Sequence, residues 1–224
     1  MDMTEYNKVS DMTYLEYCDY LQGKYGVGLC DYMTKSYNKN KKVTRTKEGL
    51  FVHHKMEDHM IMLAQPEIAQ MCPIEWQKKE NLVYCDYLEH LFLHILICKY
   101  PAADKVPIAK VGIGGVVNFL APELNDIYSG WEPKLVWKKN CVDKIKNDKD
   151  VYIALLERFI RENKDDTYFE IEKLLRSYNE EYGGWSQKNN SDLNDKIKDI
   201  YNKYNTGVKG LKRYIIDKDL CEIC

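Results

Sequence analysis

The chain has 224 residues, of which 45% are hydrophobic and 30% are charged, so it is long enough to bury a core and has the composition of a globular protein. Its net charge of −2 excludes a global attraction to nucleic acid, and any contact with a phosphate backbone therefore requires a local basic patch. No apolar run has transmembrane length, the first ten residues do not resemble a signal peptide, and the eight cysteines lack paired spacing. We therefore expect a cytoplasmic protein with free thiols and no membrane partner.

The first predicted helix covers residues 10–22, where Ser10 or Asp11 could cap its start. Its apolar stripe consists of Tyr14, Tyr17, Cys18 and Leu21. Three glycines within residues 23–28 are expected to end this helix. Residues 1–44 are thus predicted to be an N-terminal helical segment that ends in a basic linker.

The most basic run of the chain is NKNKKVTRTK, residues 38–47. Charge runs are most often solvated loops, but this run lies beside the histidine-rich segment described next, which favours contact with a phosphate backbone. The candidate nucleic-acid-binding residues are Arg45, Lys47, Lys41 and Lys42. Arg45 is the first of these, because a guanidinium can bind a phosphate through two hydrogen bonds.

All the histidines of the chain lie between residues 49 and 97: His53, His54, His59, His90 and His94. The run LFVHH is β-prone, and neighbours on a strand point to opposite faces, so His53 and His54 cannot have the same function. One of them can join other histidines at a metal while the other faces a different wall of the site.

From Leu82 onward the residues are almost all apolar or aromatic, which suits a buried helix, and Leu88, Leu91, Phe92, Ile95 and Leu96 form one apolar stripe. His90 and His94 fall on the opposite side, four residues apart, where both imidazoles can turn toward one metal ion. Two core histidines satisfied by hydrogen bonds would give the same pattern. Together with the histidines of the strand, however, the pair indicates a three-histidine metal site plus one free histidine, as in metal-assisted hydrolases.

Asn81 lies nine residues before His90 and thirteen before His94. With His53 and His54, this spacing resembles the HNH, or His-Me finger, endonucleases of the ββα-metal fold, in particular the nuclease colicins. NLVYC is similar to the NLV-type strand of HNH motifs. The resemblance covers residues 48–97, although the segment between His54 and Asn81 is longer than in compact HNH motifs.

The resemblance implies a function for each matched residue. His53, His90 and His94 would hold one divalent metal ion, with zinc, manganese or nickel favoured over magnesium because the ligands are imidazoles. His54 would be the general base that activates water. Asn81 would orient the His54 imidazole through its side-chain carbonyl.

The insertion between the matched histidines, residues 55–80, is predicted to hold a short helix and a loop. Glu57 or Asp58 could contact a metal, although acidic residues in a turn are usually solvated. His59 lies outside the HNH pattern, and its expected function is at most contact with a substrate.

The remainder of the chain, residues 101–224, is predicted to be a helical C-terminal region. A GxGG run at residues 112–115 lacks the context of a phosphate-binding loop, so we interpret it as close helix packing or a loop. Amphipathic patterns predict helices over residues 150–166, over residues 170–184 with glycines at the C-terminal end, and from Ser191 onward. The final CxxC pair, Cys221 and Cys224, is interpreted as free thiols.

The sequence therefore predicts an α+β protein, mostly helical, with an HNH-like ββα-metal unit embedded at residues 45–100. The predicted function is metal-dependent hydrolysis of phosphodiester bonds in DNA, with RNA as a further possible substrate. One alternative is a non-catalytic HNH-fold factor of phage or mobile-element type that binds nucleic acid or protein and keeps a structural metal. Another is a helical interaction protein, with a protein partner or self-association through the C-terminal helices.

Overall fold

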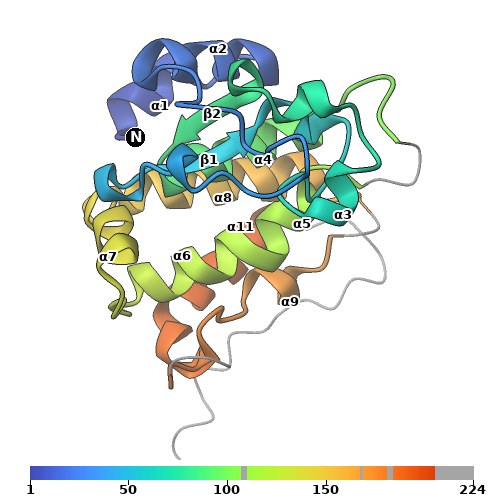
Figure 1. Cartoon of the computed structure of the whole chain (residues 1–224). Coiled ribbons are helices and arrows are strands. Elements are labelled where there is room, and N and C mark those ends of the chain that lie inside the picture. Colours follow the sequence, from blue (N-terminus) through green and yellow to red (C-terminus); the bar gives the residue numbers. More distant parts are fainter. Residues whose placement is uncertain (107–109, 167–168, 181–183, 205–224) are drawn as a thin grey trace, which may run out of the picture.

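The computed structural model describes residues 1–106, 110–166, 169–180 and 184–204. Helices dominate these residues, and the one sheet among them has two strands, so the fold is α+β and mostly helical, as the sequence predicts (Figure 1). In chain order, the helices and strands are α1 (Met3–Val9), α2 (Tyr14–Tyr25), β1 (Phe51–His54), α3 (Pro66–Ala69), β2 (Leu82–Cys85), α4 (Tyr87–Lys99), α5 (Ile113–Gly115), α6 (Ala121–Tyr128), α7 (Val136–Asp143), α8 (Lys149–Asn163), α9 (Ile171–Leu174) and α11 (Ser191–Tyr204).

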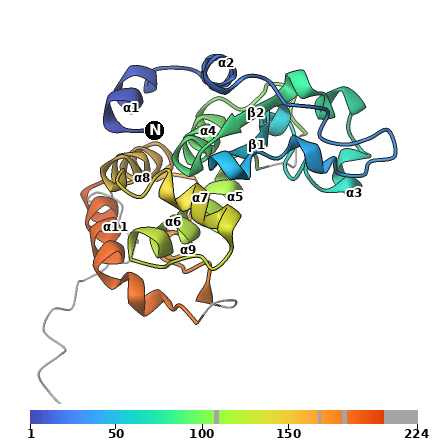
Figure 2. The ribbon, with the colours of Figure 1, turned by 60° about the vertical axis from the view of Figure 1, so that its left-hand side comes forward.

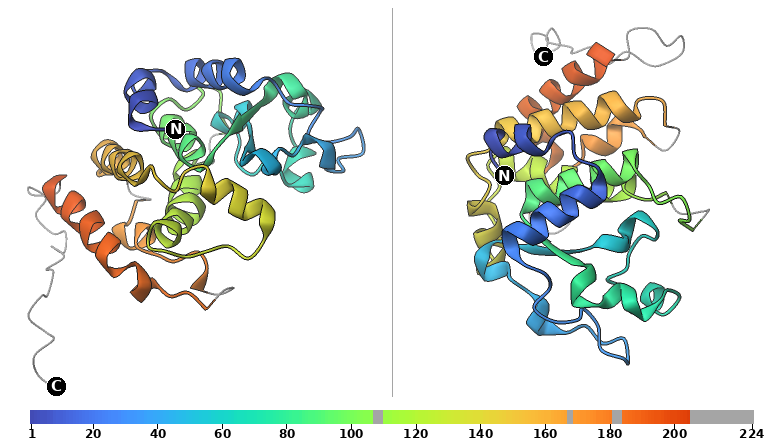
Figure 3. Two further views of the ribbon diagram at one scale, coloured as in Figure 1. Left: turned by 90° about the vertical axis from the view of Figure 1, so that its left-hand side faces the viewer. Right: turned by 90° about the horizontal axis from the view of Figure 1, so that it is seen from above.

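Strands β1 and β2 pair in antiparallel fashion, with Phe51 opposite Cys85 and His54 opposite Leu82. Each strand has a valine beside a phenylalanine or tyrosine, residue types that favour strands. The two strands are joined not by a tight turn but by residues 55–81, which carry α3 and several short 3₁₀ turns. This connection and the sheet lie at the end of the molecule away from α11 (Figure 3).

Helix α4 follows β2 directly and confirms the predicted buried helix from Tyr87 on, whereas Leu82–Cys85, where the apolar run begins, form β2. A capping box starts it: Asp86 accepts a hydrogen bond from the Glu89 amide at 2.8 Å, and Glu89 accepts one from the Asp86 amide at 2.7 Å. From Tyr87 to Ile97 every residue except the half-buried His90 is buried. A helix that is apolar on nearly all sides packs inside a core. Neighbouring segments therefore bury other faces of α4 as well as the predicted apolar stripe.

The core of the protein surrounds α4. Helix α2 packs against α4 and β2, while α5 and α8 contact α4 from other sides (Figure 2). Residues from Met1 to Tyr201 contribute to one hydrophobic cluster, so the N-terminal helices, the sheet and the C-terminal helices share a core. Across the described ranges, no helix combines the length and apolarity needed to cross a membrane.

The N-terminal prediction of one helix over residues 10–22 is wrong in its boundaries. The structure has α1 before this segment, and α2 begins only at Tyr14. The cap of α2 is Thr13, which forms a capping box with Glu16, rather than Ser10 or Asp11. Because a reciprocal capping box satisfies two amides at once, it fixes the start of α2 at this position.

The C-terminal half contains α6, α7, α8, α9 and α11. The predicted helix over residues 170–184 is much shorter in the structure, since α9 ends at Leu174. The chain then bends, because Asp126 of α6 accepts hydrogen bonds from the backbone amides of Tyr178 and Asn179. The predicted helix from Ser191 onward is confirmed as α11. The predicted free thiols Cys221 and Cys224 lie outside the described residues.

Candidate metal centre

The three histidines predicted as metal ligands come together in space. His53 on β1 and His90 and His94 on α4 each offer one ring nitrogen, and these atoms all lie within 4.8 Å of one another. We call His53, His90 and His94 the three-histidine cluster. His90 Nε2 and His94 Nε2 are 3.3 Å apart. Because zinc–imidazole bonds of about 2.0–2.1 Å give a tetrahedral edge of about 3.4 Å, this spacing fits two ligands of one ion.

The His53 ring is fixed by Tyr14 of α2. The Tyr14 hydroxyl donates to the Lys55 carbonyl oxygen at 2.9 Å and therefore accepts from His53 Nε2 at 2.9 Å. With its proton on Nε2, His53 presents an unprotonated Nδ1, and this buried atom has no hydrogen-bond partner among the described residues. The His53 ring lies 5.2 Å from the rings of both His90 and His94, and a histidine with a free lone pair beside two further imidazoles can serve as a metal ligand.

Burial keeps the cluster neutral. It lowers the pKa of His53 to about 3, against the attraction of the Glu57 carboxylate, and it lowers the pKa of His90 and His94 as well. Only a neutral imidazole, which keeps a lone pair on one ring nitrogen, can bind a metal ion. The three ligands are therefore ready for metal binding near pH 7.

Glu57 lies at the site, although acidic residues of this turn were expected to be solvated. Its Oε2 atom lies 3.6 Å from both His53 Nδ1 and His94 Nε2, and its Oε1 atom lies 3.8 Å from His54 Nδ1. Burial alone would raise the pKa of Glu57. The surrounding imidazoles, above all His53, have the larger opposite effect, so the pKa of Glu57 is lowered overall. Glu57 thus adds a negative charge between the cluster and His54. A 3₁₀ turn at Lys55–Asp58 brings it back over β1.

His54 is separated from the cluster and oriented by Gln77. The Gln77 amide group donates to the Leu63 carbonyl oxygen at 3.1 Å, so its Oε1 accepts from His54 Nε2, also at 3.1 Å. The unprotonated Nδ1 of His54 therefore faces Glu57. The His54 side chain is only 1% exposed.

The contact predicted between Asn81 and His54 is absent from the side-chain hydrogen bonds of the described residues. The Asn81 amide group instead donates to the Glu75 carbonyl oxygen at 2.8 Å. Asn81 ends a 3₁₀ turn just before β2, and Gln77 occupies the position beside His54. The sequence offered no signal for Gln77, since its contact depends on the path of the long connection between the strands.

Glycines after α4 make room for the cluster, as the interpretation of residues 112–115 as close packing predicts. Gly112 has φ +80°, and a Cβ there would lie 2.7 Å from the His94 carbonyl oxygen. A Cβ on Gly115 would overlap the imidazole ring of His94, whereas a Cβ on Gly114 would have ordinary contacts.

We therefore expect Gly115→Ala to weaken zinc binding about 10-fold, because the His94 ring must move, as outer-shell changes at metal sites typically do. Competition with a chromophoric chelator measures this affinity. Gly114→Ala is the matched control and should bind zinc like the wild type. Equal zinc affinity of the two variants would contradict the placement of His94 in the centre.

In the basic run before β1, the arginine side chain is hydrogen-bonded within the protein, whereas the candidate lysines are exposed. Arg45, the predicted phosphate ligand, forms two hydrogen bonds with Glu48, at 2.7 and 2.6 Å, and a third with the Tyr25 carbonyl oxygen. Its guanidinium also lies over the Tyr84 ring. These contacts use three of its five N–H donors and tie Arg45 to neighbouring segments, while its binding of phosphate stays a prediction. The exposed candidates are Lys41, Lys42 and Lys47.

The ion-pair contacts of His59 are with two aspartates and not with the three-histidine cluster. Its Nδ1 lies 2.6 Å from Asp58 Oδ1, and its Nε2 lies 3.2 Å from Asp104 Oδ1. The backbone of the same turn accepts hydrogen bonds from Ala102 and Val106. His59 therefore ties the segment after α4 to the connection between the strands.

Comparison of the chain with models of protein families, with curated proteins and with solved structures gives no match. Function must therefore be argued from the site itself. The arrangement offers three neutral imidazoles for a metal ion, a fourth imidazole with a fixed tautomer, and a carboxylate between them.

Proposed function

We propose that the protein is a metal-dependent nuclease of the HNH type that hydrolyses phosphodiester bonds of DNA. The observation that carries this proposal is the three-histidine cluster beside a histidine on the same strand whose tautomer is fixed. The order of the supporting elements, an antiparallel strand pair followed directly by a helix, is that of a ββα-metal unit. The spacing of His54, Asn81, His90 and His94 resembles that of HNH nucleases, and these enzymes use a ββα-metal unit.

His54 is the general base in this proposal. It would take a proton from water at Nδ1, and Gln77 would hold the other ring nitrogen as a donor throughout. Glu57, with Oε1 3.8 Å from Nδ1, would stabilise the imidazolium that results. The predicted orienting function of Asn81 thus passes to Gln77.

His53, His90 and His94 would hold one divalent ion, and the imidazole donors favour zinc, manganese or nickel over magnesium. When bound, such an ion supplies positive charge that polarises the phosphate and stabilises the leaving oxygen. Exposed Lys41, Lys42 and Lys47 would position the DNA backbone.

A second candidate function is a nucleic-acid- or protein-binding factor in which the metal only stabilises the fold. The near-complete burial of His54 favours it, because a general base needs access to water. Glu57 favours it too, since a carboxylate beside two of the three histidines could close the coordination of a structural ion.

Nicking of supercoiled plasmid tests the proposal. We expect the wild type to nick DNA with manganese, zinc or nickel and not with EDTA. His54→Gln, which keeps a polar side chain in the buried position, should nick at least about 100-fold more slowly, as expected for loss of a general base. It should still bind one metal ion per chain.

Different outcomes separate the alternatives. If neither protein nicks DNA but each binds one metal ion that raises its melting temperature, the metal is structural and the nuclease proposal fails. If His54→Gln loses the metal, the functions of His53 and His54 are reversed.

A further inference from the structure

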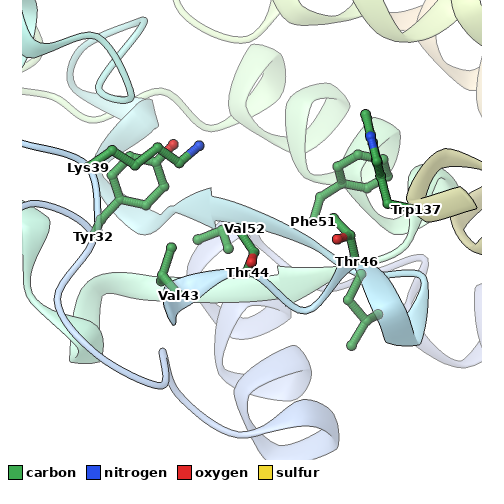
Figure 4. Close-up of a pocket in the computed structure, with 9 residues that line it drawn as sticks. Tyr32, Lys39, Val43, Thr44, Thr46, Phe51, Val52 and Trp137 are labelled. Carbon is green, nitrogen blue, oxygen red and sulfur yellow. The ribbon is translucent and has the colours of Figure 1, made fainter. Parts of the chain in front are cut away.

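A pocket of about 410 Å³ lies along β1, between the basic run before the strand and helix α7. Its volume is in the range of small-molecule sites, roughly 300–1,000 Å³. We call it the β1 pocket; its lining residues are Tyr32, Lys39, Val43, Thr44, Thr46, Leu50, Phe51, Val52 and Trp137. Figure 4 shows Tyr32 and Lys39 at one end of the pocket and Phe51 and Trp137 at the other.

The walls of the β1 pocket combine aromatic rings with hydroxyl groups. Trp137 is 42% exposed although its indole is large and apolar, so part of this side chain is accessible to a ligand. Thr44 donates its hydroxyl proton to the Lys41 carbonyl oxygen, so its oxygen can accept hydrogen bonds from a ligand. Flat apolar walls with a few polar groups suit a nucleobase.

One lysine, Lys39, lines the β1 pocket, and Lys41, Lys42 and Lys47 belong to the same basic run. Lys39 lies over the Tyr32 ring, with Nζ 4.9 Å from its centroid. For Lys39, Lys41, Lys42 and Lys47, no carboxylate of residues 1–106, 110–166, 169–180 or 184–204 lies within 4.0 Å of the ammonium group. These four charges, unlike that of Arg45, are free to meet a phosphate backbone.

The β1 pocket shares two of its walls with the candidate metal centre. The Phe51 ring lies 6.2 Å from the His90 ring at an interplanar angle of 29°, and the Tyr32 ring lies 4.4 Å from the His54 ring. A ligand in the pocket is thus one side chain away from both the three-histidine cluster and the proposed base.

We propose that the β1 pocket binds one nucleobase of the DNA strand that is cut, stacked on Trp137, with the adjoining backbone on the lysines. This inference rests on the proposed nuclease function and defines its substrate class. A base inside a duplex is stacked and paired, so it cannot enter a pocket of this kind without leaving the helix. The substrate is therefore single-stranded DNA or DNA with unpaired nucleotides.

Binding without metal tests the pocket apart from cutting. Fluorescence anisotropy in EDTA compares a labelled single-stranded 12-mer with the same sequence as a duplex. We expect the wild type to bind the single strand at least about 10-fold more tightly than the duplex. Trp137→Ala should weaken this binding about 10-fold, in line with the loss of one stacking contact. Trp137→Phe should restore most of it.

Val136→Ala is the matched control, since Val136 is a 76% exposed neighbour that does not line the pocket. Its affinity should stay within 2-fold of the wild type. Equal single-strand affinity of Trp137→Ala and wild type, or a preference for duplex, overturns the pocket proposal even if the protein cuts DNA. Binding that depends on Trp137, in a protein that never cuts with any metal, supports the pocket and overturns the nuclease.

Discussion

As the pH falls below about 6.5, the metal-free protein is expected to lose unfolding free energy with a slope that approaches about 1.4 kcal/mol per pH unit for each cluster histidine that stays neutral when folded. In the unfolded chain these histidines titrate near their ordinary pKa of about 6.5. In the folded state burial lowers the pKa of all three, for His53 to about 3. Below pH 6.5 the unfolded state thus binds protons that the folded state does not, so stability falls toward the folded-state pKa.

Buried Glu89 acts in the opposite direction over the same range. Burial and then the charge of Asp86 raise the pKa of Glu89 to about 7, although its ion pair with Lys24 lowers it. An unfolded glutamate titrates near about 4.3. Between these values only the folded state holds a proton on Glu89, which adds stability as the pH falls and offsets one of the three histidines.

Urea unfolding at a series of pH values in EDTA measures this dependence. His90→Gln should reduce the pH slope by about one proton, or about 1.4 kcal/mol per pH unit. His59→Gln is the control, because it removes a histidine outside the three-histidine cluster. The same slope in wild type and His90→Gln would mean that His90 is charged in the folded protein, and the interpretation of the cluster as neutral ligands would then be wrong.

Asp126→Asn is expected to destabilise the protein by about 3 kcal/mol, because it replaces an acceptor with a donor in a site built of donors. Asp126 is fully buried on α6. One of its oxygens accepts hydrogen bonds from the Ser177 hydroxyl, from the amides of Tyr178 and Asn179, and from the Asn179 side chain. The other accepts from Asn190 at 2.7 Å.

An asparagine cannot keep this set of contacts. If the NH₂ group of the new asparagine replaces the oxygen that accepts from Asn190, it faces the NH₂ group of Asn190. Asn190 cannot turn over without losing the hydrogen bond that it accepts from Trp185. If the NH₂ group replaces the other oxygen, the donors of residues 177–179 lose their acceptor.

Urea unfolding midpoints of wild type and variant give the size of the effect. Asp143→Asn is the matched control: its carboxylate is 48% exposed and pairs with Lys146, and such surface pairs contribute about 0–1 kcal/mol. A loss below about 1 kcal/mol in Asp126→Asn would show that the chain after α9 is held by other contacts.

Local patterns were sufficient for the elements that carry the site. The β-prone residues of LFVHH predict strand β1, and strand alternation assigns different functions to His53 and His54. The period of 3.6 residues predicts α4 and places His90 and His94 on one face. These signals are read within one element, where the spacing of residues determines which side chains are neighbours.

The partners of these histidines depended on the tertiary structure. Gln77 lies 23 positions from His54 in the chain, yet it makes the contact predicted for Asn81. Glu57 reaches the cluster only because a 3₁₀ turn reverses the chain after β1. Arg45 differs from the lysines around it because the fold places Glu48 and the Tyr25 carbonyl oxygen within reach of its guanidinium.

The sequence by itself thus determined the secondary structure around the site and the residues that could bind a metal ion, because helix and strand periodicity are local properties of the chain. Only the tertiary structure decided which polar group orients His54, where α9 ends and which cations stay free. These outcomes depend on hydrogen bonds between segments that are distant in sequence, such as those of Asp126 with residues 177–179. No local pattern encodes such contacts, since each needs the path of the whole chain between its two ends.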